Sequence, residues 1–293
     1  MLWGEYWSNT SGTLPLPPRG PWQQVADLNA AVLRNLPEDK SLADDFVKKS
    51  MSDAFDYLKY LLEELKKEEA KYEDSVDALT SQELFDIALE RRWTCSDCGN
   101  VTVSDIPAAE AGHGVGLSVP LQEPRNGLSL IEYLRSVFEE TLTIRCTDGA
   151  CKQGKDHAGK PRQQIKRITK SPEVLVVRLA RFAFGTADGE PAMVKVRNRC
   201  AFEEYLNLGE FTESGESLMY RLDGVVAHSG SVTSGHYIAA VRERDGKSFC
   251  SINDDRSIAR NRRGTVEELE QPQSMGTNFD PYVLVYSRVG ACV

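Results

Sequence analysis

The run Val174-Leu175-Val176-Val177 is short, apolar and continuous, and such a run predicts a strand that is buried on both faces. Similar runs recur at residues 237–241 and 282–286, with turn residues between them. Upstream of these runs, apolar residues recur at spacings of three and four, which is the period of a helix. Because the helices precede the strands instead of alternating with them, the sequence predicts an α+β fold with a mainly antiparallel sheet.

Three segments in the N-terminal third have the apolar spacing of amphipathic helices, at residues 22–36, 52–65 and 80–92. An extended, proline-rich arm over residues 1–21 precedes them. Ser52 is the expected N-cap of the second helix, whose buried stripe ends at Leu65. The third opens on a capping box formed by Thr80 and Glu83, and we expect the chain to be mostly helical up to Arg92.

The composition is that of a globular protein. The 293 residues are 41% hydrophobic and 27% charged, which suffices for a full core. No stretch approaches 18 consecutive apolar residues, so no membrane span is expected. The net charge of −9 repels a phosphate backbone, which argues against nucleic acid as a partner. The first twenty residues do not have the pattern of a secretory signal, so we expect the cytoplasm or the nucleus.

Two cysteine pairs have the spacing of metal ligands. Cys95 and Cys98 form a C-x2-C turn, and Cys146 and Cys151 form a second, wider pair. Two such turns aim four thiolates at a common point, so we predict one structural Zn²⁺ that holds the tips of two long strand pairs together. The alternatives are two surface turns with inert cysteines, or a redox motif at the first pair. The remaining cysteines are expected to be core or surface thiols: Cys200, Cys250 and Cys292.

His236 is the candidate general base. A loop of small residues, 229–235, precedes it and a strand follows it, so the imidazole is held on one side and open on the other. The strand at residues 249–252 leads into Asn253 and Asp254, and a hairpin would bring one of these beside the imidazole to fix its tautomer. The alternative is an ordinary loop histidine.

These segments together resemble the ubiquitin-specific protease family, which comprises papain-like cysteine isopeptidases. Ser52-Asp53-Ala54-Phe55-Asp56-Tyr57-Leu58 resembles the family's Gln-Asp-Ala-His-Glu-Phe-Leu helix, and the two cysteine pairs follow it. The later matching segments, in the family's order, are 172–175, 179–182, 220–222, 228–230, 235–237, 253–255 and 282–286. The resemblance covers the chain from about Gln23 to Arg288.

The resemblance implies a papain-like architecture with a helical thumb, zinc-stapled fingers and an antiparallel palm sheet. It places an arm at 1–21, the thumb at 22–92, the fingers at 93–170 and the palm at 171–290. It also implies roles for single residues. His236 would be the catalytic base, with Asn253 or Asp254 as its partner. Ubiquitin, free or attached to proteins, would contact Asp53, Asp56, Gly235 and Tyr237.

One departure from the family pattern concerns the nucleophile. The family carries it in an N-terminal box resembling Gly-Asn-Thr-Cys-Tyr-x-Asn-Ser, which also supplies part of the oxyanion hole, but this chain has no cysteine before Cys95. Milder departures are Phe55 in place of the motif's His and Ala180 in place of its Lys. We therefore expect the chain as given to be inactive.

Three interpretations follow from this departure. In the first, the chain is a deubiquitinase domain that lacks its Cys box through truncation or a misplaced start, so that its thumb is N-terminally incomplete. In the second, it is a pseudoenzyme that binds ubiquitin without cleaving it. In the third, it is a zinc-stapled interaction scaffold with no affinity for ubiquitin.

Overall fold

The computed structural model describes residues 53–69, 80–106, 115–121, 127–144, 146, 151, 160–187, 189–243, 245–253, 257–264, 266–269 and 279–290. The arm and helix expected before residue 52, Ser52 itself, Asp254 and Cys292 lie outside these ranges. The chain divides into two units, Met1–Ser52 and Asp53–Val293, and the description below concerns the second unit alone.

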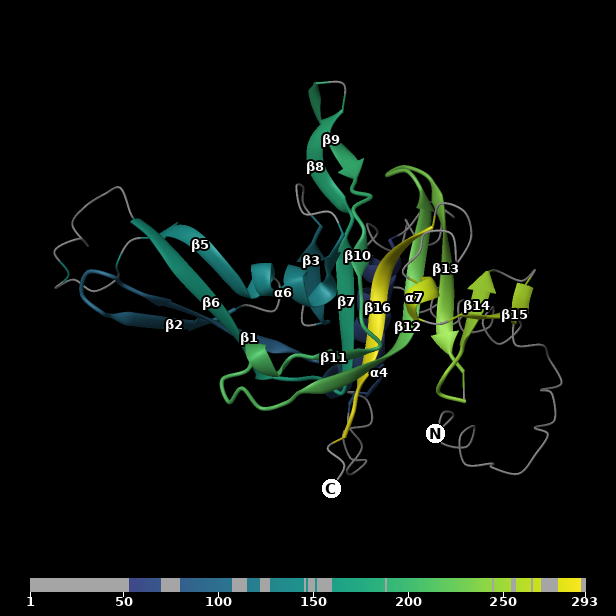
Figure 1. Cartoon of the computed structure of the whole chain (residues 1–293), viewed down its shortest axis with the longest axis horizontal. Coiled ribbons are helices and arrows are strands. Elements are labelled where there is room, and N and C mark those ends of the chain that lie inside the picture. The colour runs from purple at the N-terminus through teal and green to yellow at the C-terminus, as the bar shows by residue number, and fades with distance from the viewer. Residues whose placement is uncertain are drawn as a thin grey trace. The chain divides into compact units, whose positions relative to one another are not determined.

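An eight-stranded sheet forms the centre of this unit (Figure 1). Its strands are β3 (Leu117–Pro120), β7 (Val174–Ala180), β11 (Tyr205–Asn207), β12 (Met219–Gly230), β13 (Gly235–Arg242), β14 (Phe249–Asn253), β15 (Ser257–Gly264) and β16 (Asp280–Arg288). Their order is β15-β14-β13-β12-β16-β7-β3, and β11 pairs with β12. The β3–β7 pair is parallel and the other pairs of this sheet are antiparallel, which confirms the α+β prediction.

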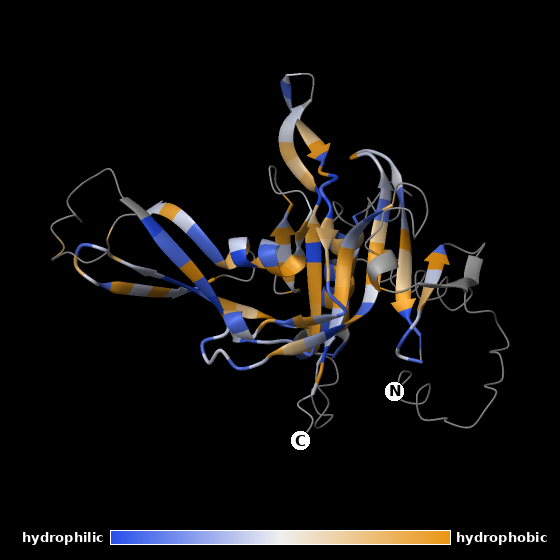
Figure 2. Cartoon of the chain, in the orientation of Figure 1, coloured by the Kyte–Doolittle hydropathy of each residue, from blue (hydrophilic) through white to orange (hydrophobic). Residues whose placement is uncertain are grey.

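The three apolar runs of the sequence lie in β7, β13 and β16, all of which are interior strands of the sheet, and β7 and β16 are neighbours. Figure 2 shows apolar residues along these strands. Helix α6 (Leu130–Phe138) adds four buried side chains to the same core: Leu130, Tyr133, Leu134 and Phe138. Each fully buried side chain of this size contributes about 1.5–3 kcal/mol, so this core is the main source of stability.

Helix α4 (Ala54–Glu69) confirms the second predicted helix but not its details. Its N-cap is Asp53, whose Oδ1 accepts hydrogen bonds from the backbone N–H groups of Phe55 (2.8 Å) and Asp56 (3.1 Å). Phe55 is 1% exposed, whereas Leu65 is 41% exposed. Ala54, Leu58 and Leu62 of the predicted stripe are buried or partly buried, so the buried face includes Phe55 in addition to the stripe and ends before Leu65.

Helix α5 (Ser81–Phe85) begins at the predicted capping box. Glu83 accepts from the Thr80 N–H at 2.8 Å, and the Thr80 hydroxyl accepts from the Glu83 N–H at 3.2 Å. The prediction of mostly helical chain up to Arg92 is wrong, because strand β1 spans Ala88–Thr94. Pairing on both sides, with β2 (Val101–Asp105) and β6 (Lys160–Lys170), overrides the local helical spacing.

Strands β1, β2 and β6 join β5 (Glu139–Ile144) in a four-stranded sheet of order β2-β1-β6-β5. It consists of two antiparallel hairpins, β1–β2 and β5–β6, which meet where β1 pairs with β6. The remaining elements are β4 (Leu128–Ser129), β8 (Phe182–Ala187), β9 (Glu190–Lys195), β10 (Cys200–Ala201), η3 (Gly209–Phe211) and α7 (Val266–Leu269). Among the helices of the described residues, none is long and apolar enough to cross a bilayer.

Candidate functional site

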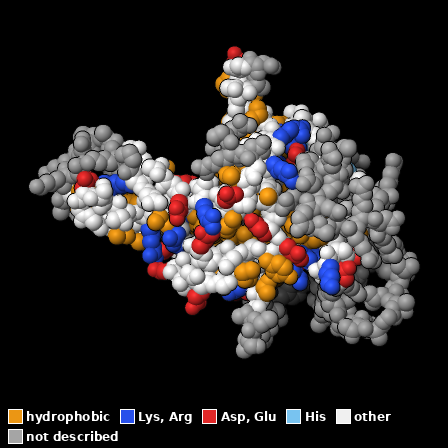
Figure 3. Space-filling model, in the orientation of Figure 1, with side chains coloured by type: hydrophobic (Ala, Val, Ile, Leu, Met, Phe, Trp, Pro, Cys, Tyr) orange, Lys and Arg blue, Asp and Glu red, His pale blue; other side chains and the backbone are white. Residues whose placement is uncertain are grey.

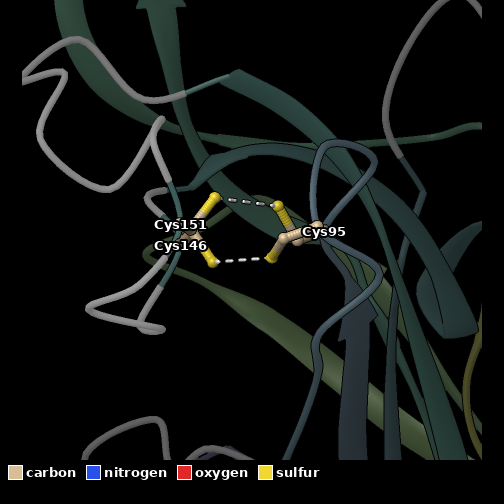
Figure 4. Close-up of side chains that lie close together, drawn as sticks. Cys95, Cys146 and Cys151 are labelled. Carbon is tan, nitrogen blue, oxygen red and sulfur yellow. Dashed lines mark hydrogen bonds between the residues drawn. The ribbon is translucent and has the colours of Figure 1, made fainter.

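Four cysteines meet at the end of the four-stranded sheet (Figure 4). Cys95 and Cys98 lie in the turn between β1 and β2, and Cys146 and Cys151 lie between β5 and β6. The sulfurs of Cys95 and Cys151 are 3.9 Å apart, and those of Cys98 and Cys146 are 3.8 Å apart. All four sulfurs lie within 4.8 Å of one another. The two pairs that the sequence singled out are therefore brought together.

These four residues fit a zinc ion. Zn–S bonds of about 2.3 Å in a tetrahedron place neighbouring sulfurs roughly 3.8 Å apart. The observed sulfur–sulfur separations of 3.8 and 3.9 Å match the distance expected between two ligands of such a tetrahedron. They are far longer than the roughly 2.05 Å bond of a disulfide. Cys95, Cys146 and Cys151 are buried, as suits a closed structural site. The cluster can thus hold Zn²⁺ as a tetrathiolate.

The surroundings of Cys95 favour its thiolate. Burial raises the pKa of this thiol, but backbone N–H groups of Asp97 and Cys98 and the side chain of Arg162 act in the opposite direction and lower it to about 6. A thiolate is the form that binds metal, so the local hydrogen bonds prepare Cys95 as a ligand.

His236 and Asn253 form a hydrogen bond of 2.7 Å between Nε2 and Oδ1. The register of β13 and β14 explains the contact, since Ala239 lies opposite Ile252 and Asn253 therefore lies opposite Ile238, two residues from His236. Because Oδ1 only accepts, Nε2 carries the proton and Nδ1 carries the lone pair. Such a ring is oriented and tautomerically fixed as a general base requires.

A tight turn places His236 at the beginning of β13. The backbone N–H of Ser231 donates to the Ser234 carbonyl at 2.7 Å, and Gly230 has φ 114°, a conformation that other residues rarely adopt. His236 is half-buried and Asn253 is exposed. The sequence left open whether Asn253 or Asp254 is the partner; the bond described here is with Asn253, and Asp254 lies outside the described residues.

A second histidine lies beneath this turn. His228 is 1% exposed, and neither of its ring nitrogens has a hydrogen-bond partner among the described residues. Burial, together with the charge of Lys195, lowers the pKa of His228 to about 4, so its ring is neutral at pH 7. A Cβ on Gly235 would lie 2.2 Å from Nε2 of His228 and 2.2 Å from the Ser229 carbonyl oxygen. Only glycine fits before His236.

The expected ubiquitin contacts lie around the N-terminal end of α4. Besides capping the helix, Asp53 accepts a hydrogen bond from the Tyr282 hydroxyl. Asp56 forms an ion pair of 2.6 Å with Lys59, and its side chain is 43% exposed. Tyr237 is half-buried and packs on His228 with ring centroids 4.6 Å apart. Asp53 and Tyr237 thus have internal contacts that the sequence did not suggest, whereas the Asp56 side chain is partly open to solvent.

A buried ion pair ties β9 to the histidine-bearing part of the large sheet. The Lys195 side chain, 4% exposed, lies 2.9 Å from the carboxylate of Asp280 and donates to the His228 carbonyl at 2.8 Å. Arg197 reaches the same carboxylate at 3.3 Å and the Gly230 carbonyl at 3.2 Å. On the face drawn in Figure 3, the acidic and basic side chains of the described residues are interspersed.

The cysteines outside the cluster lie in the larger sheet region. Cys200 is 2% exposed in β10, and Cys250 is half-buried in β14. Neither forms a disulfide, in agreement with the expectation of core or surface thiols, and Cys292 lies outside the described residues. Sequence reasoning missed His228, Lys195 and Arg162. His228 was quoted as part of a motif, but nothing in the local sequence indicates that it is buried.

This fold is the papain-like cysteine peptidase architecture predicted from the sequence, with the histidine on a mainly antiparallel sheet. A separate cluster of four cysteines, which could hold zinc, lies between two hairpins. The model of the "Ubiquitin carboxyl-terminal hydrolase" family matches residues 36–286. The chain belongs to this family.

Individual relatives are similar over parts of the chain. Ubiquitin carboxyl-terminal hydrolase 10 of Saccharomyces cerevisiae is 37% identical over 91 residues, which are 30% of this chain and 11% of that protein. Ubiquitin carboxyl-terminal hydrolase 2 of Gallus gallus is 27% identical over 192 residues, which are 64% of this chain and 49% of that protein. The chain thus spans half or less of the length of these two relatives.

Solved structures share the fold. The SAGA Ubp8/Sgf11/Sus1/Sgf73 DUB module bound to ubiquitin aldehyde contains a chain with a TM-score of 0.65 and 20% identity, covering 91% of this chain and 54% of that chain. Another structure of the Ubp8-Sgf11-Sgf73-Sus1 SAGA DUB module gives a TM-score of 0.58 at 20% identity, covering 92% of this chain and 57% of that chain.

Proposed function

We propose that the chain is most of a ubiquitin-specific protease domain, and that His236 is its general base. The observation that carries the proposal is the 2.7 Å bond between His236 and Asn253 in a chain of this family. In the proposed domain, residues 93–170 are the zinc-stapled fingers and 171–290 the palm, after an incomplete thumb. We place the protein in the cytoplasm or nucleus, where its cysteines stay reduced.

The proposed reaction is thiol-dependent hydrolysis of the isopeptide bond at the C-terminal glycine of ubiquitin. Nδ1 of His236 takes the proton of a cysteine thiol, and the thiolate attacks the glycine carbonyl carbon. The imidazolium then protonates the departing lysine amine, and water hydrolyses the thioester with His236 again acting as base. Asn253 keeps Nε2 protonated and the ring oriented throughout.

The nucleophile is the missing component. Four of the seven cysteines form the proposed zinc site, Cys200 is buried in β10, Cys250 is half-buried in β14 and Cys292 is the penultimate residue. The family carries its nucleophile in an N-terminal box, but no cysteine precedes Cys95. We therefore propose that the thiol comes from sequence that is not part of these 293 residues. The chain as given should not turn over a ubiquitin C-terminal ester or amide, because its base has no thiol to activate.

Ubiquitin is the proposed partner. The family name and the ubiquitin aldehyde bound to a structural relative support this assignment. Ubiquitin's C-terminal tail carries arginines, and the exposed carboxylate of Asp56 offers a charge-assisted contact to one of them. Gly235 and Tyr237, beside His236, are the proposed contacts for the tail near the reacting bond.

The test compares two proteins on a fluorogenic ubiquitin substrate. The first is the chain as given. The second is extended by any upstream coding sequence that encodes a Gly-Asn-Thr-Cys box in frame. The proposal expects turnover only in the extended chain, its loss with His236→Ala, and a decrease of at least about 100-fold with Asn253→Ala. Activity of the unextended chain that disappears with Cys200→Ser, Cys250→Ser or Cys292→Ser would overturn it.

The second candidate function is ubiquitin binding without cleavage, and the absence of a cysteine before Cys95 favours it. If no Cys box is encoded upstream but titration calorimetry detects ubiquitin binding, the domain is a pseudoenzyme. If neither protein binds ubiquitin, the third interpretation, a zinc-stapled scaffold, replaces both.

A further inference from the structure

Arg162 lies on β6 between the two cysteine turns. The β1–β6 register pairs Trp93 with Gln164, so its continuation by two residues places Cys95 opposite Arg162. On the other side, β5 pairs Leu142 with Arg162, and this hairpin leads to Cys146. Residues opposite each other in antiparallel strands project to the same face. The register therefore directs the Arg162 side chain toward the cluster from β6, the strand that pairs with both β1 and β5.

The guanidinium of Arg162 is buried and incompletely bonded. The residue is 5% exposed, and its Nε and Nη1 make no hydrogen bond to any residue that the structure describes. It interacts with the thiols of Cys95 and Cys146, and the hydrogen bond with Cys95 raises the pKa of Arg162 although burial lowers it. A buried guanidinium with unused N–H groups is costly unless an anion lies beside it. The neighbouring sulfurs are the groups that can become this anion.

The charge of a metal-bound cluster explains this arrangement. Zn²⁺ and four thiolates sum to a charge of −2, and the cluster is mostly buried. We propose that Arg162 is a positioning residue of the zinc site, which donates hydrogen bonds to the thiolate sulfurs of Cys95 and Cys146 and neutralises half of the charge of the metal-bound cluster. The inference rests on the proposed zinc centre. Arg162 would raise the zinc affinity of the four cysteines without itself binding the ion.

The proposed role of Arg162 is tested by the zinc affinity of the purified full chain. This affinity is measured by competition with a chromogenic chelator. Loss of a hydrogen-bonding partner of a metal ligand usually costs ten- to a hundredfold in metal affinity, and we expect Arg162→Gln to fall in that range. Arg162→Lys keeps the charge but loses the forked donor set, so its affinity should lie between those of Arg162→Gln and the unsubstituted chain. Arg167→Gln is the matched control, since Arg167 lies on the same strand and donates to the Lys166 carbonyl at 3.0 Å.

Substitution of cobalt for zinc gives an absorption spectrum that reports on the thiolate ligands. If Arg162 only stabilised the fold, its replacement would leave this spectrum unchanged. Hydrogen bonds lower the donor strength of a thiolate, so their loss in Arg162→Gln or Arg162→Lys should shift the sulfur-to-cobalt charge-transfer band to longer wavelength. If Arg162→Gln does not fold, Arg162→Lys decides alone. Zinc affinity within twofold of the unsubstituted chain, with an unshifted cobalt band, overturns the inference. If the unsubstituted chain binds no zinc, it is instead the zinc proposal that fails.

Discussion

The hydroxyl of Tyr282 on β16 donates a hydrogen bond to the carboxylate of Asp53, which also caps α4. Arg178 on β7 reinforces the contact, because its Nε donates to the same hydroxyl at 3.1 Å and its guanidinium lies over the ring of Phe55. The carboxylate of Asp53 thus links the first described helix to two neighbouring interior strands of the large sheet, β16 and β7.

We expect Asp53→Ala to lower the free energy of unfolding by about 2–4 kcal/mol, because it removes a helix cap and leaves the Tyr282 hydroxyl without its acceptor. Asp56→Ala is the control on the same helix. Its exposed ion pair with Lys59 should contribute less than about 0.5 kcal/mol. Urea unfolding measures both, and equal effects of the two substitutions would contradict the structural role of Asp53.

Asp56→Ala alone should weaken ubiquitin binding by at least about tenfold, since a partly desolvated charge-assisted pair contributes about 1.5–3 kcal/mol. Asp53 is unsuitable for this test because its loss also disturbs α4. Titration calorimetry with Glu63→Ala, an exposed acid on the same helix, as control measures the effect. Unchanged affinity in a chain that binds ubiquitin would remove Asp56 from the proposed interface.

Purified protein should contain one equivalent of zinc, and chelation should lower its Tm by on the order of 5–10 °C, because the ion joins the two hairpins of the four-stranded sheet. Cys98→Ser should abolish the effect of the chelator by removing one ligand. Less than half an equivalent of zinc in carefully purified protein, or unchanged melting of Cys98→Ser, would contradict the site.

Stability should fall as the pH decreases from about 6.5 toward 4 because of His228. Its pKa is about 4 in the folded protein but about 6.5 when unfolded, so in this window the unfolded chain binds a proton that the folded chain does not. The slope approaches at most about 1.4 kcal/mol per pH unit.

His228→Phe keeps a ring in contact with Phe182 and Tyr237 but cannot titrate. The difference in unfolding free energy between this variant and the unsubstituted chain should therefore change between pH 6.5 and 4.5. Urea titrations at several pH values measure it, and a constant difference across that window would be evidence against a buried neutral His228.

Asp280→Asn should destabilise the protein by about 3–5 kcal/mol, because it leaves the buried ammonium of Lys195 without its carboxylate. The double variant Lys195→Met with Asp280→Asn should recover most of this loss, since no buried charge then remains unpaired at that position. A double-mutant cycle from urea unfolding gives the coupling energy. Additive effects would show that the two side chains do not interact.

The sequence was most informative where chemistry depends on neighbours along the chain. The spacing of Cys95 and Cys98 and the hairpin that joins His236 to Asn253 follow from local order, and both predictions agree with the geometry. Strand β1 was missed because its pairing partner β6 lies far along the chain. Strand β3 was missed for the same reason, since its partner is β7 and its surroundings are rich in glycine and proline.

Burial was likewise hidden from the sequence. Nothing in its local sequence shows that Arg162 lies beside two cysteine turns, or that Lys195 is enclosed together with Asp280. These side chains are buried only because distant strands close over them. Their environment is a property of the sheet and not of a motif.

The order β2-β1-β6-β5 would couple the proposed zinc binding to folding. The chain between Cys98 and Cys146 contains β3 and α6, which belong to the main core, and β5 begins at Glu139, directly after the last residue of α6. Docking of this intervening segment brings the second cysteine pair close to the first, and closing so long a loop has an entropic cost. The metal would then bind late in folding. A substitution that damages the main core would therefore also weaken metal binding.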